Sequence, residues 1–468
     1  MFWDHHDLPL EDIDRIEVIR GPGATVWGAN AVNGVINIMT KSARATQGGL
    51  VTAGTGSEQR ALGVLRYGGQ IGSQGSYRVF GKYFKVDDMV LPDGRQGVDG
   101  WRRLQGGFRS DWRLSPRDSL TVEGDLFSNR GAQTRWSAFI VVSPLVGVFN
   151  EKLTVRGGNL LGRWNRTLSG GSELSLQVYY DSYRRVDLGV PETLNTLDLD
   201  FQHHVVLGSR HDIVWGLAYR VATSGLAPGY KISFSPPERT DNLYSTFVQD
   251  EIRMTDSLWF TLGSKFEHNA YTGFEFEPSL RLAWTPSRRH TIWAAASKAI
   301  RQPSRLDTAL STPLAEFPGY DGVLQVINFQ GNPNFKTEQL RDYEIGYRAQ
   351  ASRGPSFDVA TFISSYRRLQ NIEQGRPYFV SSPPPPRLVL PWTYGNQGRA
   401  RNYGAELSAS WNVTSSWRIS PGYTFIHMNV SMPLNASATG GPASRWNSAL
   451  WGRISCARGA WSSATHMP

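Results

Sequence analysis

The chain has 468 residues, with 49 lysines and arginines against 40 aspartates and glutamates. Aromatic residues (16 Trp, 18 Tyr and 21 Phe) and 48 glycines are frequent, whereas charged residues make up a low 19%. The single cysteine, Cys456, excludes an internal disulfide and a Cys-rich zinc module. The most apolar stretch, residues 137–149, is too short for a membrane-crossing helix. The chain has no block of basic residues that would indicate nucleic-acid binding.

The first predicted element is a pair of short strands, residues 13–20 and 34–38, separated by a glycine-rich turn. Gly23 and Gly28 have the spacing of a phosphate-binding loop. However, residues 29–30 are Ala-Asn, where such a loop needs Lys followed by Ser or Thr. We therefore interpret these glycines as structural.

From Gly49 onward, runs of about 9–15 residues alternate apolar and polar side chains and then end at a turn, a pattern that predicts strands with one apolar face. Short turns alternate with long loops, as is typical of an outer-membrane barrel, and we count about 17 or 18 strands. The sequence therefore predicts an all-β fold, a transmembrane antiparallel β-barrel. Short turns are expected at 115–118, 169–171, 208–210, 255–257, 286–288 and 413–415, and long loops at 86–100, 128–152, 182–194, 221–240, 301–336 and 370–400.

Residues 13–41, IDRIEVIRGPGATVWGANAVNGVINIMTK, resemble the last part of the plug domain of TonB-dependent outer-membrane receptors. The match is nearly position by position, with Asp14 for the usual Glu and Trp27 for the usual Tyr. Three weaker matches follow in the family's order, at residues 247–251, 301–304 and 332–348. The resemblance gives a structural or gating role to the plug-motif residues Arg15, Glu17, Arg20, Gly21, Pro22, Gly23, Gly28, Asn30, Gly34 and Asn37.

The resemblance implies a barrel of 22 strands in the bacterial outer membrane, with the plug folded inside its lumen. Residues 1–47 are then the C-terminal remnant of the plug, and residues 48–468 the barrel, truncated at its C-terminal end. The resemblance also implies a signal peptide and an N-terminal box that binds TonB. We expect both upstream of this chain, so we expect the chain to be a fragment. Alternation fades after about residue 443, which also fits a truncated or frame-shifted end.

The function that the resemblance implies is uptake of a scarce nutrient, a ferric siderophore or cobalamin. The expected partners are the TonB energising complex, the metal-chelate or cobalamin ligand, outer-membrane lipid and lipopolysaccharide. We expect a monomer without a cofactor. Two alternatives stay open at this point, a passive porin or adhesin barrel and a non-functional product of a disrupted receptor gene.

The plug arginines Arg15 and Arg20 are candidates for ion pairs with carboxylates of the barrel wall. Plug arginines of the resembling family pair with barrel carboxylates, and Glu251 or Glu344 are the candidate partners here. A buried arginine and a carboxylate favour bidentate pairing, but an arginine in a water-filled lumen is also stable when it is only solvated.

Two loops are candidates for the ligand mouth, since long loops on a rigid scaffold often bind ligands. One contains Phe139 and Phe149, and the other is proline-rich and precedes Trp392 and Tyr394. Arginines near these loops in sequence favour an anionic ligand, although contact with lipopolysaccharide phosphates is the alternative. These arginines are Arg301, Arg305, Arg367, Arg368, Arg387, Arg399 and Arg401.

No sequence pattern indicates catalysis or a metal site. The motifs of zinc proteases and of serine hydrolases are absent. The adjacent histidines 203 and 204 would point to opposite faces of a strand. We therefore expect a protein that is not an enzyme and has no metal centre.

Overall fold

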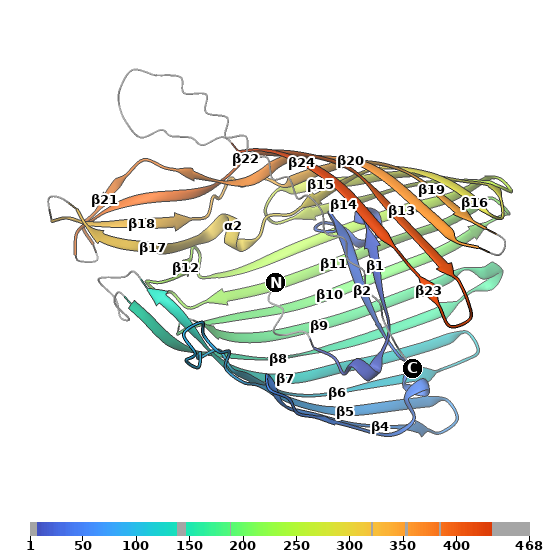
Figure 1. The fold of residues 1–468 in the computed structure, drawn as a ribbon, viewed down its shortest axis with the longest axis horizontal. Helices are drawn as coiled ribbons and strands as arrows, with labels where there is room; N and C mark the ends of the chain where they lie inside the picture. Colours follow the sequence, from blue (N-terminus) through green and yellow to red (C-terminus); the bar gives the residue numbers. More distant parts are fainter. Residues whose placement is uncertain are drawn as a thin grey trace, which may run out of the picture.

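The computed structural model describes residues 7–137, 147–187, 189–319, 322–351, 354–382 and 385–432. These residues form a wall of antiparallel strands around a lumen, and a two-stranded hairpin crosses that lumen (Figure 1). The predicted all-β antiparallel barrel is confirmed. None of the helices in the described residues is long and apolar enough to span a membrane.

The first elements fold inside the lumen and precede the wall. They are η2 (Leu10–Asp12), β1 (Ile13–Arg20), α1 (Ala24–Trp27), β2 (Gly34–Thr40) and η3 (Ala43–Thr46). The wall strands are β3 (Gly48–Gly54), β4 (Gln59–Ile71), β5 (Gly75–Val86), β6 (Trp101–Arg113), β7 (Asp118–Ser137), β8 (Gly147–Thr167), β9 (Glu173–Asp187), β10 (Val190–Leu207), β11 (His211–Leu226), β13 (Glu238–Thr255), β14 (Leu258–Asn269), β15 (Gly273–Ser287), β16 (His290–Arg301), β19 (Glu338–Gln350), β20 (Ser356–Gln374), β22 (Arg387–Asn412) and β24 (Gly422–Ser431).

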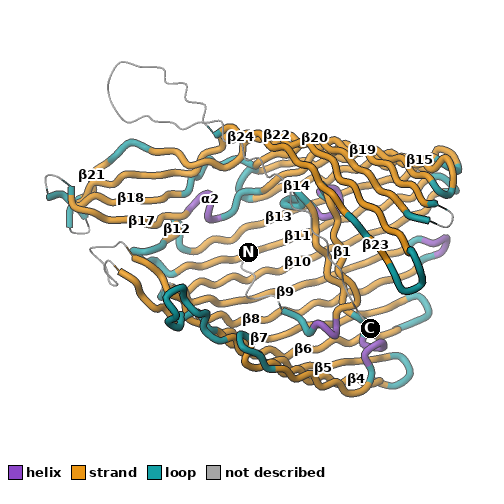
Figure 2. The backbone as a smooth tube through the Cα atoms, viewed as in Figure 1, coloured by secondary structure: helices purple, strands orange, loops and turns teal. Residues whose placement is uncertain are grey.

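Short turns join the wall strands at one end and long connections at the other (Figure 2). At the long-loop end, additional short elements form a sheet that extends the wall, in which β18 runs parallel to β22 (Figure 1). The short strands are β12 (Ser233–Phe234), β17 (Leu310–Pro318), β18 (Leu324–Gln330) and β21 (Tyr378–Val380), and the helix α2 (Arg305–Ala309) directly precedes β17. Without that extension and the two-residue β23 (Arg418–Ile419), the described wall has 17 strands, in agreement with the expected 17 or 18.

The expected long loop at 182–194 is wrong. β9 continues to Asp187 and β10 begins at Val190, and Arg184 pairs with Thr193 within the sheet. The apolar outward pattern stops at Tyr180, because the following outward residues are Ser182 and Arg184. Backbone pairing does not need an apolar face, so the strands extend beyond the point where the sequence pattern fades.

The two faces of the wall differ in character. Outward positions carry exposed apolar side chains such as Val178, Leu262 and Tyr343. Lumen positions carry polar side chains, and those under the hairpin are buried, as for Lys265 and Glu277. The interior of this protein is therefore polar, and its apolar surface lies outside, as expected for a barrel in lipid.

Replacing Gly68 by alanine is expected to destabilise the barrel by about 1–2 kcal/mol. Gly68 of β4 faces the lumen where the chain passes from η3 into the wall, and an added Cβ would lie 2.1 Å from the Thr46 carbonyl oxygen. The midpoint of the heat-induced shift in gel mobility measures this effect. Gly63→Ala on the same strand is the control, because its Cβ would meet nothing within 4 Å. Equal midpoints for the two variants would contradict the expectation.

Candidate functional site: the plug hairpin and the loop base

The hairpin of β1 and β2 spans the lumen between opposite parts of the wall (Figure 1). Its register runs from the Ile13–Thr40 pair at one end to the Arg20–Gly34 pair at the other. Exposed apolar side chains such as Ile16 and Val18 show that the hairpin is not packed like a soluble core. Polar contacts at its two ends hold it instead, so the hairpin is attached to the wall on both sides of the lumen.

The first end is anchored by Asp12, whose side chain is 1% exposed. Its carboxylate pairs with Arg66 of β4, and its Oδ2 lies 3.3 Å from Nε of Arg78 on β5. Arg78 also donates a hydrogen bond to the carbonyl of Lys41, just after β2. Asp7 adds an ion pair of 2.7 Å with Lys82 of β5. These contacts fix the open end of the hairpin to β4 and β5.

The second end is anchored by Arg20, which pairs with Glu406 of β22. The expected pairing of Arg20 with Glu251 or Glu344 is therefore not what the structure shows. Glu344 nevertheless reaches the hairpin, since its Oε1 would lie 3.0 Å from a Cβ added to Gly21. Glu251 lies exposed in β13, opposite Thr261 of β14, and forms no ion pair with the described residues.

Arg15 does not reach the wall either. Its guanidinium donates to Glu17 at 2.7 Å and to Asp14 at 3.0 Å, so both partners belong to β1. Asn37 of β2 donates a second hydrogen bond to Glu17, at 3.1 Å. Two hydrogen bonds hold the pKa of Glu17 below its usual range. The larger effect comes from Arg15 and the smaller one from Asn37. Arg15, Glu17 and Asn37 therefore stiffen the hairpin itself.

The turn between β1 and β2 packs against the wall through small and polar residues. Pro22 and Gly23 are buried there, and the hydroxyls of Thr25 and Ser279 lie 2.7 Å apart. Tyr366 of β20 donates a hydrogen bond of 2.8 Å to the side chain of Asn33. The sequence motif marked this turn but gave no information on its wall partners.

Gly28 shows why this turn needs glycine. Its φ of +79° lies in the left-handed region, and a Cβ would sit 2.5 Å from Oε1 of Glu267. Lys265, beside Glu267 on β14, donates a hydrogen bond of 3.4 Å to the carbonyl of Val26. The prediction that the glycines are structural describes this position well, because both the backbone and the contact exclude a side chain.

Asn30 connects the hairpin to the segment that leads from β16 into the long loop. Its backbone N–H donates to the carbonyl of Ile300 at 2.7 Å. Its side-chain Oδ1 accepts a hydrogen bond of 3.1 Å from the backbone N–H of Gln302. Asn30 has φ +77°, a conformation that asparagine tolerates better than most residues. A plug residue thus fixes the position of the base of the loop.

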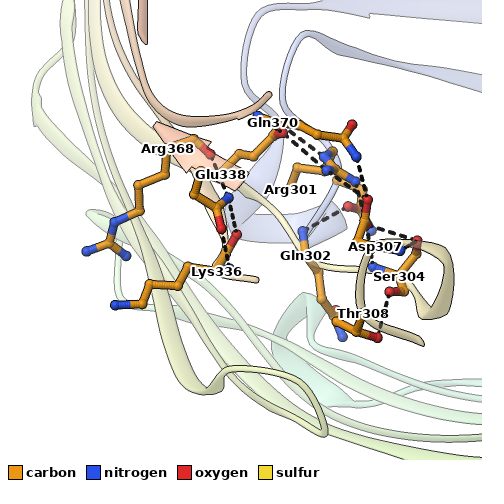
Figure 3. A network of polar contacts seen from close by, with 11 residues as sticks. Arg301, Gln302, Ser304, Asp307, Thr308, Lys336, Glu338, Arg368 and Gln370 are labelled. Atoms are coloured by element: carbon orange, nitrogen blue, oxygen red, sulfur yellow. Dashed lines mark hydrogen bonds and ion pairs between the residues drawn. The ribbon is translucent and has the colours of Figure 1, made fainter. Parts of the chain in front are cut away.

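The base of that loop is a dense polar network (Figure 3). Asp307 accepts hydrogen bonds from Arg301 at 3.0 Å and from the backbone of Ser304 at 2.7 Å, which caps α2. Glu338 of β19 holds the other side of Arg301, with 3.0 Å between Nε and Oε2. Gln370 of β20 donates to both carboxylates, through its backbone to Glu338 and through its side chain to Asp307. The network joins three wall strands to α2.

The other residues predicted for the ligand mouth are dispersed. Arg305 is buried against the carbonyls of Ser224 and Pro236, so it positions α2. Tyr394 packs edge-on against Phe329, with 4.5 Å between ring centroids. Trp392 is half-buried in β22 and Phe149 half-buried in β8, while Phe139 lies outside the described residues.

The arginines that are close in sequence to these loops are separated in space. Arg301 and Arg305 lie in the loop base, whereas Arg367, Arg399 and Arg401 occupy outward positions of β20 and β22. Tyr366 contacts the plug and Glu406 pairs with Arg20, so both face the lumen. The odd-numbered positions near them, up to Arg367 in β20 and from Arg399 in β22, therefore face outward. Arg387 lies 5.9 Å from the ring centroid of Tyr230, and the backbone carbonyl of Arg368 accepts a hydrogen bond from Asn396.

A polar cavity of about 590 Å³ lies between α1 and the wall strands β8 to β14. Three cations and three carboxylates line it, and one pair, Arg220 and Asp198, is only 2.7 Å apart. Such a balanced polar lining suits water and polar solutes. The charged residues are Arg163, Arg220, Lys265, Asp198, Asp200 and Glu267, and the plug contributes Val26, Trp27, Ala29 and Asn30.

Two family models match the chain. The one described as "TonB dependent receptor-like, beta-barrel" matches residues 50–466, and the one described as "TonB-dependent Receptor Plug Domain" matches residues 2–35. Solved structures agree in fold. The siderophore receptor PirA from Pseudomonas aeruginosa has a TM-score of 0.68 at 18% identity, over 92% of this chain and 77% of that one. PirA from Acinetobacter baumannii has a TM-score of 0.70 at 16% identity, over 92% and 72%.

Curated relatives are similar along much of the chain. The iron-regulated outer membrane virulence protein of Vibrio cholerae is 24% identical, over 90% of this chain and 63% of its own length. The ferric enterobactin receptor of Pseudomonas aeruginosa is 26% identical, over 73% of this chain and 54% of its own. The vitamin B12 transporter BtuB of Vibrio vulnificus is 22% identical, over 80% and 57%. The chain thus spans somewhat more than half the length of these relatives.

Proposed function

Because the chain belongs to the family of TonB-dependent receptors, which are outer-membrane β-barrels, we propose that it takes part in energised uptake of a metal chelate or a cobalamin. The names of its relatives mention both ligand classes, namely ferric enterobactin and vitamin B12. The family consists of transporters and receptors, and a role without catalysis is part of this proposal. The inner-membrane TonB complex would supply the energy.

The observation that supports uptake best is the tethered hairpin. A passive pore needs an unobstructed lumen, whereas here β1 and β2 cross it and are tied to the wall at both ends. Residues 1–47 would act as the plug portion and residues 48–468 as the barrel of a monomeric transporter. The hydrogen bond between Asn30 and the base of the ligand loop would serve no purpose in a passive porin or an adhesin, because neither couples ligand binding to movement of a plug.

Ligand binding at the loops would then reach the plug through that connection. A ligand that moves α2 also shifts Arg301 and Gln302, since Asp307 holds Arg301 at 3.0 Å. Gln302 is in turn hydrogen-bonded to Asn30 at 3.1 Å. The cavity beside α1 gives the solute a polar route once the plug turn moves.

The experiment is an uptake assay with two probes, radiolabelled ferric enterobactin and labelled cyanocobalamin, in cells whose outer membrane carries the chain with a signal peptide and a TonB-binding box joined upstream of it. We expect accumulation of one probe, and loss of that accumulation when an uncoupler collapses the proton gradient. Cells without the chain give the background. Uptake that an uncoupler leaves unchanged would overturn the proposal in favour of a passive pore.

A further inference from the structure

A row of cations follows the long-loop ends of β5 to β9 on the outside of the barrel. Register pairs connect Lys85 with Arg102 and Arg102 with Arg130. Arg156 of β8 pairs directly with Arg184 of β9. All five side chains are exposed. Their outward direction follows from the alternate residues Arg103, Val155 and Arg185, which are buried on the lumen side.

The acidic residues near these strand ends do not neutralise the row. Glu151 and Asp187 occupy lumen positions, where Asp187 pairs with Arg135 at 2.9 Å and with Arg185 at 3.2 Å. Lys85 has one carboxylate partner, Asp87, at 3.2 Å. Among the described residues, no side-chain hydrogen bond or ion pair involves the guanidinium groups of the four outward arginines Arg102, Arg130, Arg156 and Arg184.

Such a row costs stability unless an anion binds to it. Like charges directly opposite each other in a sheet repel, and this applies to the Arg156–Arg184 and Arg102–Arg130 pairs. A phosphate group reverses the sign of the interaction, because guanidinium groups bind phosphate through paired, charge-assisted hydrogen bonds. The arrangement therefore suits an anionic group, and a phosphate in particular, on the outside of the barrel.

An apolar groove leads up to two of these arginines. It has a volume of about 570 Å³ and lies beside Gly158 of β8, over which the side chain of the neighbouring Leu126 extends. Leu126, Leu160 and Tyr180 line it, while Arg156 and Arg184 close its upper end. Leu126 is 74% exposed, a large value for a leucine that faces water but the ordinary state of one that faces lipid.

We propose that this groove binds a phosphorylated lipid of the outer leaflet, with an acyl chain along Leu126, Leu160 and Tyr180 and a headgroup phosphate on Arg156 and Arg184. The family's location in the outer membrane puts the groove against lipid. The change from apolar to cationic side chains along β8 and β9 matches the change from acyl chains to headgroups. The site lies outside the lumen and is independent of the ligand that the transporter takes up.

The test compares binding of diphosphorylated lipid A to the detergent-purified chain and to the double variant Arg156→Gln/Arg184→Gln. We expect the double variant to bind roughly tenfold more weakly or worse, since each cation near a charged headgroup contributes appreciably to binding. Dephosphorylated lipid A and inorganic phosphate are expected to bind poorly to the unaltered chain, because each supplies one half of the interaction.

The control variant is Arg166→Gln, which removes an outward arginine from the short-turn end of the same strand, where Asp118 lies 3.8 Å away. It is expected to bind lipid A as the unaltered chain does. Heat-shifted gel mobility verifies that each variant is folded. Equal lipid binding by the double variant, an equal loss in Arg166→Gln, or competition by inorganic phosphate as strong as by lipid A would each overturn the proposal.

Discussion

Replacing Asp12 by asparagine is expected to lower the free energy of unfolding by about 3–5 kcal/mol. Asp12 is 1% exposed and is shared by Arg66 and Arg78, which are themselves 12% and 5% exposed. Loss of the carboxylate leaves two buried guanidinium groups without the partner that they share. Urea unfolding of the folded barrel measures the change.

The same substitution is expected to release the open end of the hairpin from β4 and β5. Trypsin should then cut faster at Arg15 and Arg20, which lie within the hairpin. Asp14→Asn is the matched control, because Asp14 is about half exposed and its partner Arg15 is 54% exposed. We expect that variant to unfold and to be cleaved like the unaltered chain. Equal destabilisation by both substitutions would show that Asp12 is not an anchor.

Replacing Asp307 by asparagine is expected to weaken the loop base by about 2–3 kcal/mol, because one carboxylate accepts hydrogen bonds from several elements. Its partners are Arg301, the capping Ser304 and the side chain of Gln370. An amide cannot accept from all of them. Hydrogen–deuterium exchange should accelerate over α2, and also at the amide of Asn30, which donates to the carbonyl of Ile300.

The exchange at Asn30 is the informative readout, since a local defect of α2 would leave the plug unchanged. Asp93→Asn serves as the control. Asp93 also lies at the long-loop end, but it pairs with an exposed arginine, Arg95, at 2.6 Å. We expect that variant to alter exchange around its own loop alone. Faster exchange confined to α2 in Asp307→Asn would argue against a connection between the loop base and the plug.

The barrel class followed from the sequence because alternation and turn chemistry are local properties. The lengths of the strands did not follow in the same way. β9 and β10 pair beyond Tyr180 although their outward residues become polar, so the pattern ended before the hydrogen bonding did. Sequence alternation reports which residues face lipid, and it loses its signal wherever a strand rises above the apolar band.

The plug motif was visible in sequence, but its partners were not. Glu406 and Glu344 both occupy lumen positions, and the choice between them depends on how the turn after β1 sits against β19 and β22. That placement arises from pairings between strands far apart in the chain. No local spacing encodes it, which is why the predicted partners for Arg15 and Arg20 were wrong while the motif itself was found.

The arginines illustrate the same limit in a different way. Arg301 and Arg399 are both near predicted loops in sequence, yet one lies inside the loop base and the other on the outer face. A shift of one residue moves a side chain to the opposite face of a strand. Clusters of charge in a barrel sequence therefore need the register before a ligand can be assigned to them.

The direction of β1 and β2 determines how the hairpin responds to mechanical load. Asp7 and η3 leave the hairpin at the same end, and η3 is tied to the wall through the amide of Ala43 and Asp111. A pull on the chain at Asp7 therefore peels the strands apart instead of shearing them. The Ile13–Thr40 pair opens first, and the Arg20–Gly34 pair opens last. Once the ion pairs of Asp12 with Arg66 and Arg78 have broken, one pair at a time bears the load, so the two strands separate at a lower force than shearing all pairs together would need.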